Sequence, residues 1–377
     1  MRAMRLSGCL IGLVATLGLG SAAMAGPGPT NVFVGFDFNA DGKGDIARSS
    51  SSSIRTDILD GTSSTANGSF PTGGGVFILK AAGNLNNDAN ADLAAQGGGT
   101  VRVTFVNAAG TGTAGTLFIP DGGGAWQVID AADVNGDGID EVIFNGTGGA
   151  AGAVRIANVA TGTPAYTFLS TAGGAWVYAF AVDVNGDGSK DLVFRGTGGA
   201  AGTTRANLAG TATSKFYAQG GTSWILTRAG DVDGNGTDDL VDTGAGPGLG
   251  FNRVRTLNTS GDPTGSGFVP NGGNSFVLKS VSDFTNDGNA DLAYQGATSF
   301  RVTPMTGTVA GANVFPASGG GAFTLSGMED TNADGFFDLV ATDASNGVGI
   351  RLSNGTGTTI NGAFIPSGGL VLFDAPN

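Results

Sequence analysis

Oxygen-bearing side chains recur in short runs of this sequence at the spacing of a loop that wraps a metal ion. In the run Asp183-Val-Asn-Gly-Asp-Gly-Ser-Lys-Asp191 they take the first, third, fifth and ninth positions, and a glycine takes the sixth. A hard divalent cation such as Ca²⁺ needs about six to eight oxygen ligands in a small shell. A loop that alternates such side chains around a glycine turn supplies several of them. The run therefore predicts a cation site.

Seven runs of this kind, numbered here as loops one to seven, follow one another along the chain. Their predicted ligands are Asp37, Asn39, Asp41 and Asp45; Asn84, Asn86, Asp88 and Asp92; Asp133, Asn135, Asp137 and Glu141; Asp183, Asn185, Asp187 and Asp191; Asp231, Asp233, Asn235 and Asp239; Asp283, Thr285, Asp287 and Asp291; and Asp330, Asn332, Asp334 and Asp338. Loop two keeps two carboxylates and has Ala89 where the others have glycine. Because a Cβ is penalised in the left-handed backbone conformation, we expect loop two to be the weakest site or empty.

Ligand chemistry favours calcium in these loops. Flexible all-oxygen sites suit Ca²⁺ better than Mg²⁺, which keeps its waters and demands octahedral geometry. The chain has no histidine and one cysteine, Cys9, so the ligands typical of zinc and copper sites are missing. A single Asp-Gly or Asn-Gly run is also a common hairpin turn. Seven in phase, each with an acid just before an apolar strand, predict up to seven bound Ca²⁺ ions.

The spacing of the loops predicts the fold. They begin about fifty residues apart, and Gly and Thr are too frequent for helices. Such repeats indicate an all-β fold, a seven-bladed β-propeller of four-stranded antiparallel blades. In the repeat that serves as a template, we expect strands at 176–182, 191–194, 203–208 and 214–218.

Three further positions recur once per repeat. An aromatic residue lies seven positions before the first loop ligand, a phenylalanine precedes the glycines that end each repeat, and an arginine lies on the third strand. The aromatic residues are Phe77, Trp126, Trp176, Trp224, Phe276 and Phe323; the phenylalanines are Phe70, Phe118, Phe168, Phe216, Phe268, Phe315 and Phe364; the arginines are Arg55, Arg102, Arg155, Arg205, Arg253 (or Arg255), Arg301 and Arg351. We expect the aromatic residues to pack between adjacent blades. The arginines either pair with carboxylates or form a crown that binds an anionic ligand, and we favour pairing.

The two ends of the chain have their own predictions. Residues 1–25 have the layout of a cleaved secretory signal peptide: a basic start, an apolar run and small residues before Gly26. A lipoprotein signal at Cys9 is disfavoured because the apolar run follows that cysteine. Residues 26–377 then form one propeller domain, exported to the extracellular space or the periplasm. Segments 31–36 and 370–373 both match the first strand of a blade, so we expect the two termini to meet where the ring closes.

The loops resemble those of FG-GAP/VCBS repeats, the calcium-loop blades of propellers similar to the N-terminal domain of integrin α-subunits. The resemblance covers essentially all of residues 27–377 and rests on the seven loops in phase; the literal Phe-Gly…Gly-Ala-Pro signature is degenerate here. It implies a propeller with calcium at the blade edges. Such repeats occur in adhesion receptors, lectin-like proteins and enzymes, so the family does not fix the function.

Charge and composition narrow the function. A formal net charge of −13 disfavours binding to nucleic acid or to an anionic membrane, and no further apolar run is long enough to span a bilayer. Catalysis through a Ser-His-Asp triad is impossible without histidine. The acids outside the loops (Asp57, Asp60, Asp121, Asp242 and Asp343) show no obvious pair for glycoside hydrolysis. We therefore predict a monomeric, non-catalytic, calcium-binding adhesion or binding module for an extracellular protein or glycan. A lectin-like glycan binder is the alternative, and a polysaccharide-active enzyme is a third.

Overall fold

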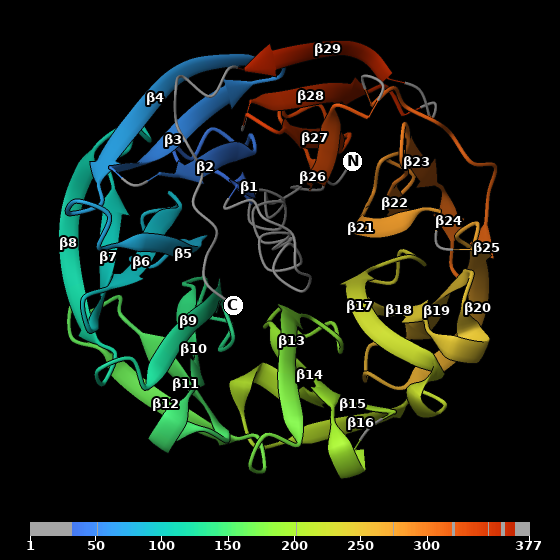
Figure 1. Ribbon diagram of the computed structural model, residues 1–377, viewed down its shortest axis with the longest axis horizontal. Coiled ribbons are helices and arrows are strands. Elements are labelled where there is room, and N and C mark those ends of the chain that lie inside the picture. Colours follow the sequence, from blue (N-terminus) through green and yellow to red (C-terminus); the bar gives the residue numbers. More distant parts are fainter. Residues whose placement is uncertain are drawn as a thin grey trace, which may run out of the picture.

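Each repeat folds into one antiparallel β-sheet, and seven sheets stand around a central axis like the blades of a propeller (Figure 1). The structure is a computed structural model and describes residues 32–365 except 51, 201, 274, 319–320, 346 and 356–358. Within those residues the chain is almost entirely β, with a few single-turn 3₁₀ helices and no α-helix. The prediction of a seven-bladed all-β propeller is confirmed.

Consecutive strands of a blade run from the axis to the rim. The innermost strands are β1 (Val32–Phe36), β5 (Ile78–Gly83), β9 (Trp126–Ala132), β13 (Trp176–Val182), β17 (Trp224–Gly230), β21 (Val277–Ser282) and β26 (Phe323–Glu329). The second strands are β2 (Asp45–Ser49), β6 (Asp92–Gly97), β10 (Glu141–Gly146), β14 (Asp191–Gly196), β18 (Asp239–Gly244), β22 (Asp291–Gln295) and β27 (Asp338–Asp343). The second strand of each blade thus begins at the ninth residue of a loop.

The outer half of each blade completes the sheet. The third strands are β3 (Ser53–Asp60), β7 (Thr100–Val106), β11 (Ala153–Asn158), β15 (Thr203–Asn207), β19 (Phe251–Leu257), β23 (Phe300–Thr303) and β28 (Val348–Ser353). The outermost strands are β4 (Ser63–Pro71), β8 (Thr113–Pro120), β12 (Ala165–Ser170), β16 (Ser214–Ala218), β20 (Pro263–Pro270) and β29 (Thr359–Ile365). The 3₁₀ turns are η2 (Gly148–Ala150), η3 (Gly198–Ala200), η4 (Leu208–Gly210), η5 (Gly221–Ser223) and η6 (Gly246–Gly248).

Blade six departs from the regular pattern. Its main sheet has the three strands β21–β23, and the place of the outer strand is taken by two isolated bridges, Ser299 to Ala317 and Val302 to Val314. Between β23 and these bridges, the chain makes a short hairpin of β24 (Met305–Thr306) and β25 (Val309–Ala310), which lies against β20 of blade five (Figure 1).

The core lies between the blades. Seven clusters of buried apolar side chains each combine residues of two neighbouring blades, and the seventh joins Ile46 and Leu59 of blade one to Val340 and Ile350 of blade seven. Five of the six periodic aromatic residues pack against these clusters: Phe77, Trp126, Trp176, Phe276 and Phe323. The prediction that they pack between blades is confirmed for these five, whereas Trp224 contacts the ring of Phe268 in its own blade.

Blades one and seven close the ring by packing, because each keeps its own complete sheet. The sequence predicted that 31–36 and 370–373 match the same strand and that the termini meet at this closure. Residues 32–36 form β1, whereas 370–373 lie outside the described residues, as does the predicted signal peptide 1–25, so these predictions stay untested. In the described part of the chain, no helix has the length and apolar character to cross a membrane.

Candidate metal centre

The ninth residue of each loop is a buried staple within its blade. Asp191, at the start of β14, is fully buried; one carboxylate oxygen accepts the backbone N–H of Val184 at 3.0 Å and the other accepts that of Ala209 at 2.7 Å. The first bond holds the loop and the second holds the end of the third strand. Asp45, Asp92, Asp239, Asp291 and Asp338 make equivalent pairs of bonds.

The first residue of the loop organises the turn itself. In loop four, Asp183 accepts backbone N–H groups from Gly186 at 2.6 Å and from Gly188 at 2.8 Å. The third and fifth residues, Asn185 and Asp187, each accept an N–H two residues further on. The side-chain oxygens predicted as metal ligands therefore also satisfy the backbone of a tight loop, as expected for short polar side chains in turns.

A ring of hydrogen bonds between blades joins all seven loops. The backbone N–H of the eighth residue of each loop donates to the carbonyl of the first residue in the preceding loop. The pairs are Ala91 to Asp37, Asp140 to Asn84, Lys190 to Asp133, Asp238 to Asp183, Ala290 to Asp231, Phe337 to Asp283 and Gly44 to Asp330. The last pair links loop one to loop seven and closes the ring. The sequence gives no sign of this ring, because every non-proline residue offers the same backbone N–H.

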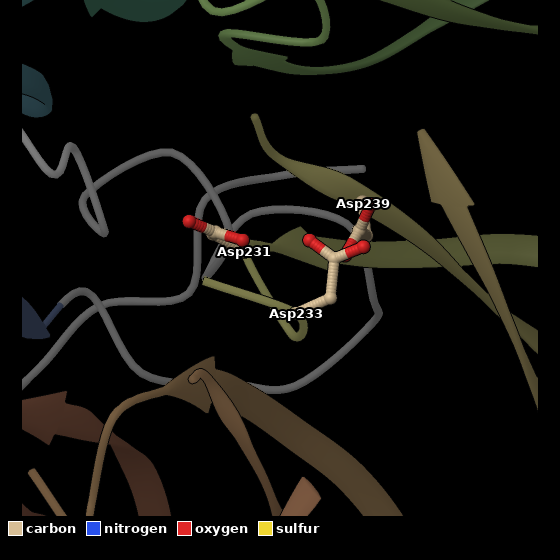
Figure 2. Close-up of side chains that lie close together, drawn as sticks. All are labelled: Asp231, Asp233 and Asp239. Atoms are coloured by element: carbon tan, nitrogen blue, oxygen red, sulfur yellow. The ribbon is translucent and has the colours of Figure 1, made fainter. Parts of the chain in front are cut away.

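Loop five brings together the carboxylates best placed for a cation. Oxygens of Asp231, Asp233 and Asp239 lie within 4.8 Å of one another. Figure 2 shows the carboxylates of Asp233 and Asp239 side by side, with that of Asp231 nearby. Oδ1 of Asp233 is buried and has no hydrogen-bond partner. A buried carboxylate oxygen without a partner is costly unless a cation or donor meets it, so these residues fit a divalent ion.

The other six loops differ at the third position. The Asn amide of loops two, four and seven donates to the fifth-position carboxylate, at 2.8–2.9 Å. In loop three, Asn135 donates to Glu141 at 2.7 Å, and in loop six the Thr285 hydroxyl donates to Asp291 at 3.1 Å. Among the described residues, loop five alone gathers three carboxylates in one group. At the fifth position of loop five, the Asn235 amide donates to the Leu257 carbonyl, and its oxygen accepts the Thr237 N–H.

Loop two has the strained turn expected from its sequence. Ala89 has a φ of 71°, where the corresponding residue of loop four, Gly188, has 87°. The alanine therefore adopts a left-handed conformation that glycine takes without penalty.

Burial raises the pKa of the ninth-position carboxyl in every loop. Asp239 has its pKa raised to about 8, first by burial and then by the charges of Asp233 and Asp231, against the lowering effect of its two backbone bonds. Burial likewise raises the pKa of Asp231. Clustered, desolvated carboxylates resist ionisation, and a bound divalent cation would favour the ionised form.

The arginines of the third strands are links between blades. Arg155 is 6% exposed, its guanidinium lies 3.9 Å from the ring centre of Phe144, and it donates to the Pro120 carbonyl of the preceding blade. Arg102 and Arg205 donate to the preceding blade in the same way. These three guanidiniums bond a backbone carbonyl of the preceding blade rather than a carboxylate, so the favoured pairing with carboxylates is wrong for them.

Carboxylate pairing does occur in blades one and five. Asp57 pairs with Arg48 and Arg55, and Asp242 with Arg253 and Arg255. Two of the acids outside the loops are therefore buried ion-pair partners. A third, Asp121, is 3% exposed and accepts a bond from Gln96.

Comparisons with known proteins support the fold. No family model matches the chain, and no curated protein matches its sequence. Similar solved structures include BBS1N in complex with ARL6DN (TM-score 0.54, 12% identity, covering 89% of this chain and 95% of that one). The Cps50 (Swd1) β-propeller domain of Myceliophteria thermophila has a TM-score of 0.51 at 10% identity, covering 85% and 96%. Hsv2 of Kluyvelomyces marxianus has a TM-score of 0.50 at 10% identity, covering 90% and 98%.

These neighbours are WD40-type propellers rather than FG-GAP/VCBS propellers. At 10–12% identity the likeness shows the fold alone. The chain therefore has the fold of a seven-bladed β-propeller.

Proposed function

We propose that this protein is a secreted propeller of the FG-GAP/VCBS type, stabilised by calcium, that serves as a non-catalytic binding or adhesion module. The observation that carries the calcium proposal is loop five, where three carboxylates converge and Oδ1 of Asp233 is buried without a partner. Asp231, Asp233 and Asp239 would hold the ion there. The ion would supply positive charge where these side chains concentrate negative charge.

The interlocked loops support a scaffold role for the metal. Asp231, the first residue of loop five, accepts the Ala290 N–H from blade six through its carbonyl. Gly307, at the tip of the β24–β25 hairpin, donates to the Val232 carbonyl of the same loop. An ion that stiffens loop five therefore acts on the junction of blades five and six, and stabilises the folded state by mass action.

Chemistry outside the loops favours binding over catalysis. The chain has no histidine, and Asp57, Asp121 and Asp242 are occupied in buried ion pairs or hydrogen bonds. A propeller fold does not by itself define a function. The disc-shaped scaffold can instead present one of its surfaces to a binding partner.

Thermal unfolding tests the calcium proposal. We expect millimolar Ca²⁺ to raise the melting temperature of the protein after treatment with EGTA, and Asp233→Asn to reduce that rise. The matched control is Asp262→Asn, an exposed acid outside the loops that pairs with Lys215. The proposal fails if Ca²⁺ shifts neither wild type nor control, or if D233N responds as fully as wild type.

A groove of about 490 Å³ between blades three and four is the observation that favours the alternative, a lectin-like glycan binder. Glu141 and Asn158 are among the residues that line this groove. Tyr166 and Phe168 also line it. They share the face of Arg155, however, and that arginine reaches towards blade two. Their rings therefore lie on the opposite side of β12 from blade four and offer no stacking platform for a sugar inside the groove. Glycan-array binding that disappears with Glu141→Gln would favour the alternative, and turnover on a polysaccharide panel would favour an enzyme.

A further inference from the structure

Six blades each expose one large aromatic side chain at an equivalent position. It is a phenylalanine near the end of the outermost strand, or of the segment that replaces this strand in blade six. The six residues, here called the rim phenylalanines, are 50–61% exposed: Phe118, Phe168, Phe216, Phe268, Phe315 and Phe364. The outermost strands form the rim of the disc (Figure 1). In blade one, the equivalent Phe70 is instead 1% exposed and belongs to a core cluster.

Each rim phenylalanine packs against the aromatic residue at or just before the start of the first strand of its own blade. The ring pairs are Phe118 with Phe77, Phe168 with Trp126, Phe216 with Trp176, Phe268 with Trp224, Phe315 with Phe276, and Phe364 with Phe323. Their ring centres lie 5.4–6.2 Å apart, and their planes are inclined by 36–70°. Tilted rings do not cover each other face to face. The rim phenylalanines therefore keep ring surface open to solvent.

The rim phenylalanines of blades two, three and four lie in the seams between blades. Each is directly opposite the arginine of the third strand and shares its face of the sheet. The pairs are Phe118 with Arg102, Phe168 with Arg155, and Phe216 with Arg205. Because these arginines donate to carbonyls of the preceding blade, the phenylalanines face that blade too. In blade three, Tyr166 is 40% exposed and extends the site, with its ring centre 6.4 Å from that of Phe168.

An open glycine turn borders the inner ring of the site in blade three. A Cβ on Gly122 would lie 3.5 Å from the Trp126 ring, so the backbone of this turn runs beside the ring. A Cβ on Gly123 or Gly124 would meet nothing within 4 Å. A ligand on the rings can therefore approach the backbone here, where N–H and C=O groups form hydrogen bonds with polar molecules.

Packing alone does not account for the exposed rings. Apolar burial is stabilising in proportion to the area removed from water, and each rim phenylalanine leaves half or more of its surface in water. The arginine beside it is already covered by other rings: the Arg155 guanidinium lies 3.9 Å from the ring centre of Phe144 and 5.1 Å from that of Trp126. Exposed apolar surface that recurs in six blades indicates a binding role.

The arrangement of the rings selects the ligand. They are spread around the circumference, one per blade, so a single surface of a globular partner cannot contact them all (Figure 1). A polymer that repeats one small unit can occupy several sites at once, which raises overall affinity without a new kind of contact. A net charge of −13 disfavours an acidic polymer. Neutral sugars fit, because their C–H groups carry partial positive charge and pack on the negative face of an aromatic ring.

We infer that the rim phenylalanines and their ring partners form six sugar-binding sites, through which the protein holds a neutral polysaccharide multivalently. The inference rests on the proposed binding role, for which it names the ligand class, and it does not depend on calcium. It places the sugar of blade three on the blade-two side of β12, outside the groove that Glu141 lines.

Co-sedimentation with insoluble cellulose, chitin, xylan and mannan tests the inference. We expect wild-type protein to bind at least one of these polymers, and Phe118→Ser/Phe168→Ser/Phe216→Ser to weaken that binding by about tenfold or more, because three sites are lost. The same triple replacement by leucine keeps apolar bulk without a ring and should weaken binding similarly. All three side chains are more than half exposed, so folding should persist, and a thermal melt checks this.

The matched control removes three exposed apolar side chains that have no ring. These are Val177, Ile225 and Val277, which are 42–55% exposed near the starts of first strands. The variant Val177→Ser/Ile225→Ser/Val277→Ser should bind the polymer as wild type does. If it loses as much binding as the phenylalanine variant, general apolar adhesion explains the result and the inference is wrong.

Three other results overturn the inference. One is a wild-type protein that binds none of the four polymers; if it captures a protein partner instead, the proposed binding role stands without the sugar sites. Another is a folded serine or leucine variant that binds as wild type does. The third is binding that EGTA abolishes while the chain stays folded, since the sugar would then be held by the metal loops. Binding that persists in EGTA supports the inference even if the calcium proposal fails.

Discussion

Replacing Asp191 by asparagine separates the two roles of the ninth loop position. The side chain is fully buried, and its two oxygens accept the N–H groups of Val184 and Ala209. Asparagine has the same shape, but it offers one oxygen and one NH₂ group. One of the two backbone N–H groups would therefore face another donor. The variant therefore disrupts this pair of hydrogen bonds whether or not a metal is bound.

The magnitude follows from the bonds that change. A hydrogen bond to a charged group contributes about 1.5–3 kcal/mol, and a buried donor left unsatisfied costs about 1–3 kcal/mol. The hydrogen bond that asparagine retains is also weaker, because its acceptor oxygen is no longer part of a charged group. Since burial raises the pKa of Asp191 to about 7, the comparison belongs at pH 8, where the carboxylate is ionised. We expect D191N to lower the free energy of unfolding by about 2–4 kcal/mol, a large fraction of the stability of a typical domain.

Urea unfolding in EGTA measures this loss without calcium. The control is Asp187→Asn, because Asp187 is exposed and accepts bonds from within the same loop; it should cost less than about 1 kcal/mol in EGTA. In millimolar Ca²⁺, both variants should lose part of any stabilisation by the ion. If D191N unfolds at the same urea concentration as wild type in EGTA, the two hydrogen bonds of Asp191 do not stabilise the blade. The ninth position would then act only through a bound metal.

Three further predictions concern the ring closure, the acids and the arginines. A Cβ on Gly44 would overlap Cγ of Glu329 across the junction of blades one and seven, so Gly44→Ala should lower the melting temperature and Glu329→Ala should partly restore it; additive losses would contradict this contact. Burial raises the pKa of Asp45, Asp92 and Asp239 to about 8 from a usual value of 3.8. Between those values the folded state binds more protons than the unfolded one, so without calcium the melting temperature should fall as the pH rises from 4 to 8, and the stabilisation by Ca²⁺ should grow; a melting temperature in EGTA that rises across this range would refute it. Arg155→Gln should cost about 1–3 kcal/mol, because its bond to Pro120 and its stacking are buried; unchanged urea unfolding would show that this link contributes nothing.

The sequence was sufficient to predict the regular part of each blade. Strands expected at 176–182 and 214–218 match β13 and β16, because alternating apolar residues bounded by glycines leave little choice of register. Blade one departs from the repeating positions that the sequence predicts. Phe70 is 1% exposed, whereas Phe118 and Phe168 are more than half exposed. It pairs with Ile54, whereas Phe118 pairs with Arg102 and Phe168 with Arg155.

The residue types of the loops predicted the candidate site, but their tertiary roles were beyond the sequence. The spacing identified Asp231, Asp233 and Asp239, which the structure brings together. It could not show that the ninth residue bonds two distant N–H groups, or that Thr285 donates its hydroxyl to Asp291. These bonds depend on the return of the third strand to the loop. The outer strand of blade six was likewise hidden, because the β24–β25 hairpin interrupts it.

The number of calcium ions bound per chain tests the central claim most directly. Protein stripped with EGTA, dialysed to equilibrium against Ca²⁺ and analysed for calcium and protein should retain at least one ion per chain. Asp233→Asn should bind fewer ions than wild type, whereas Asp262→Asn should bind as many. A wild-type protein without bound calcium, or a D233N variant with the full count, would contradict the assignment of loop five as a calcium site.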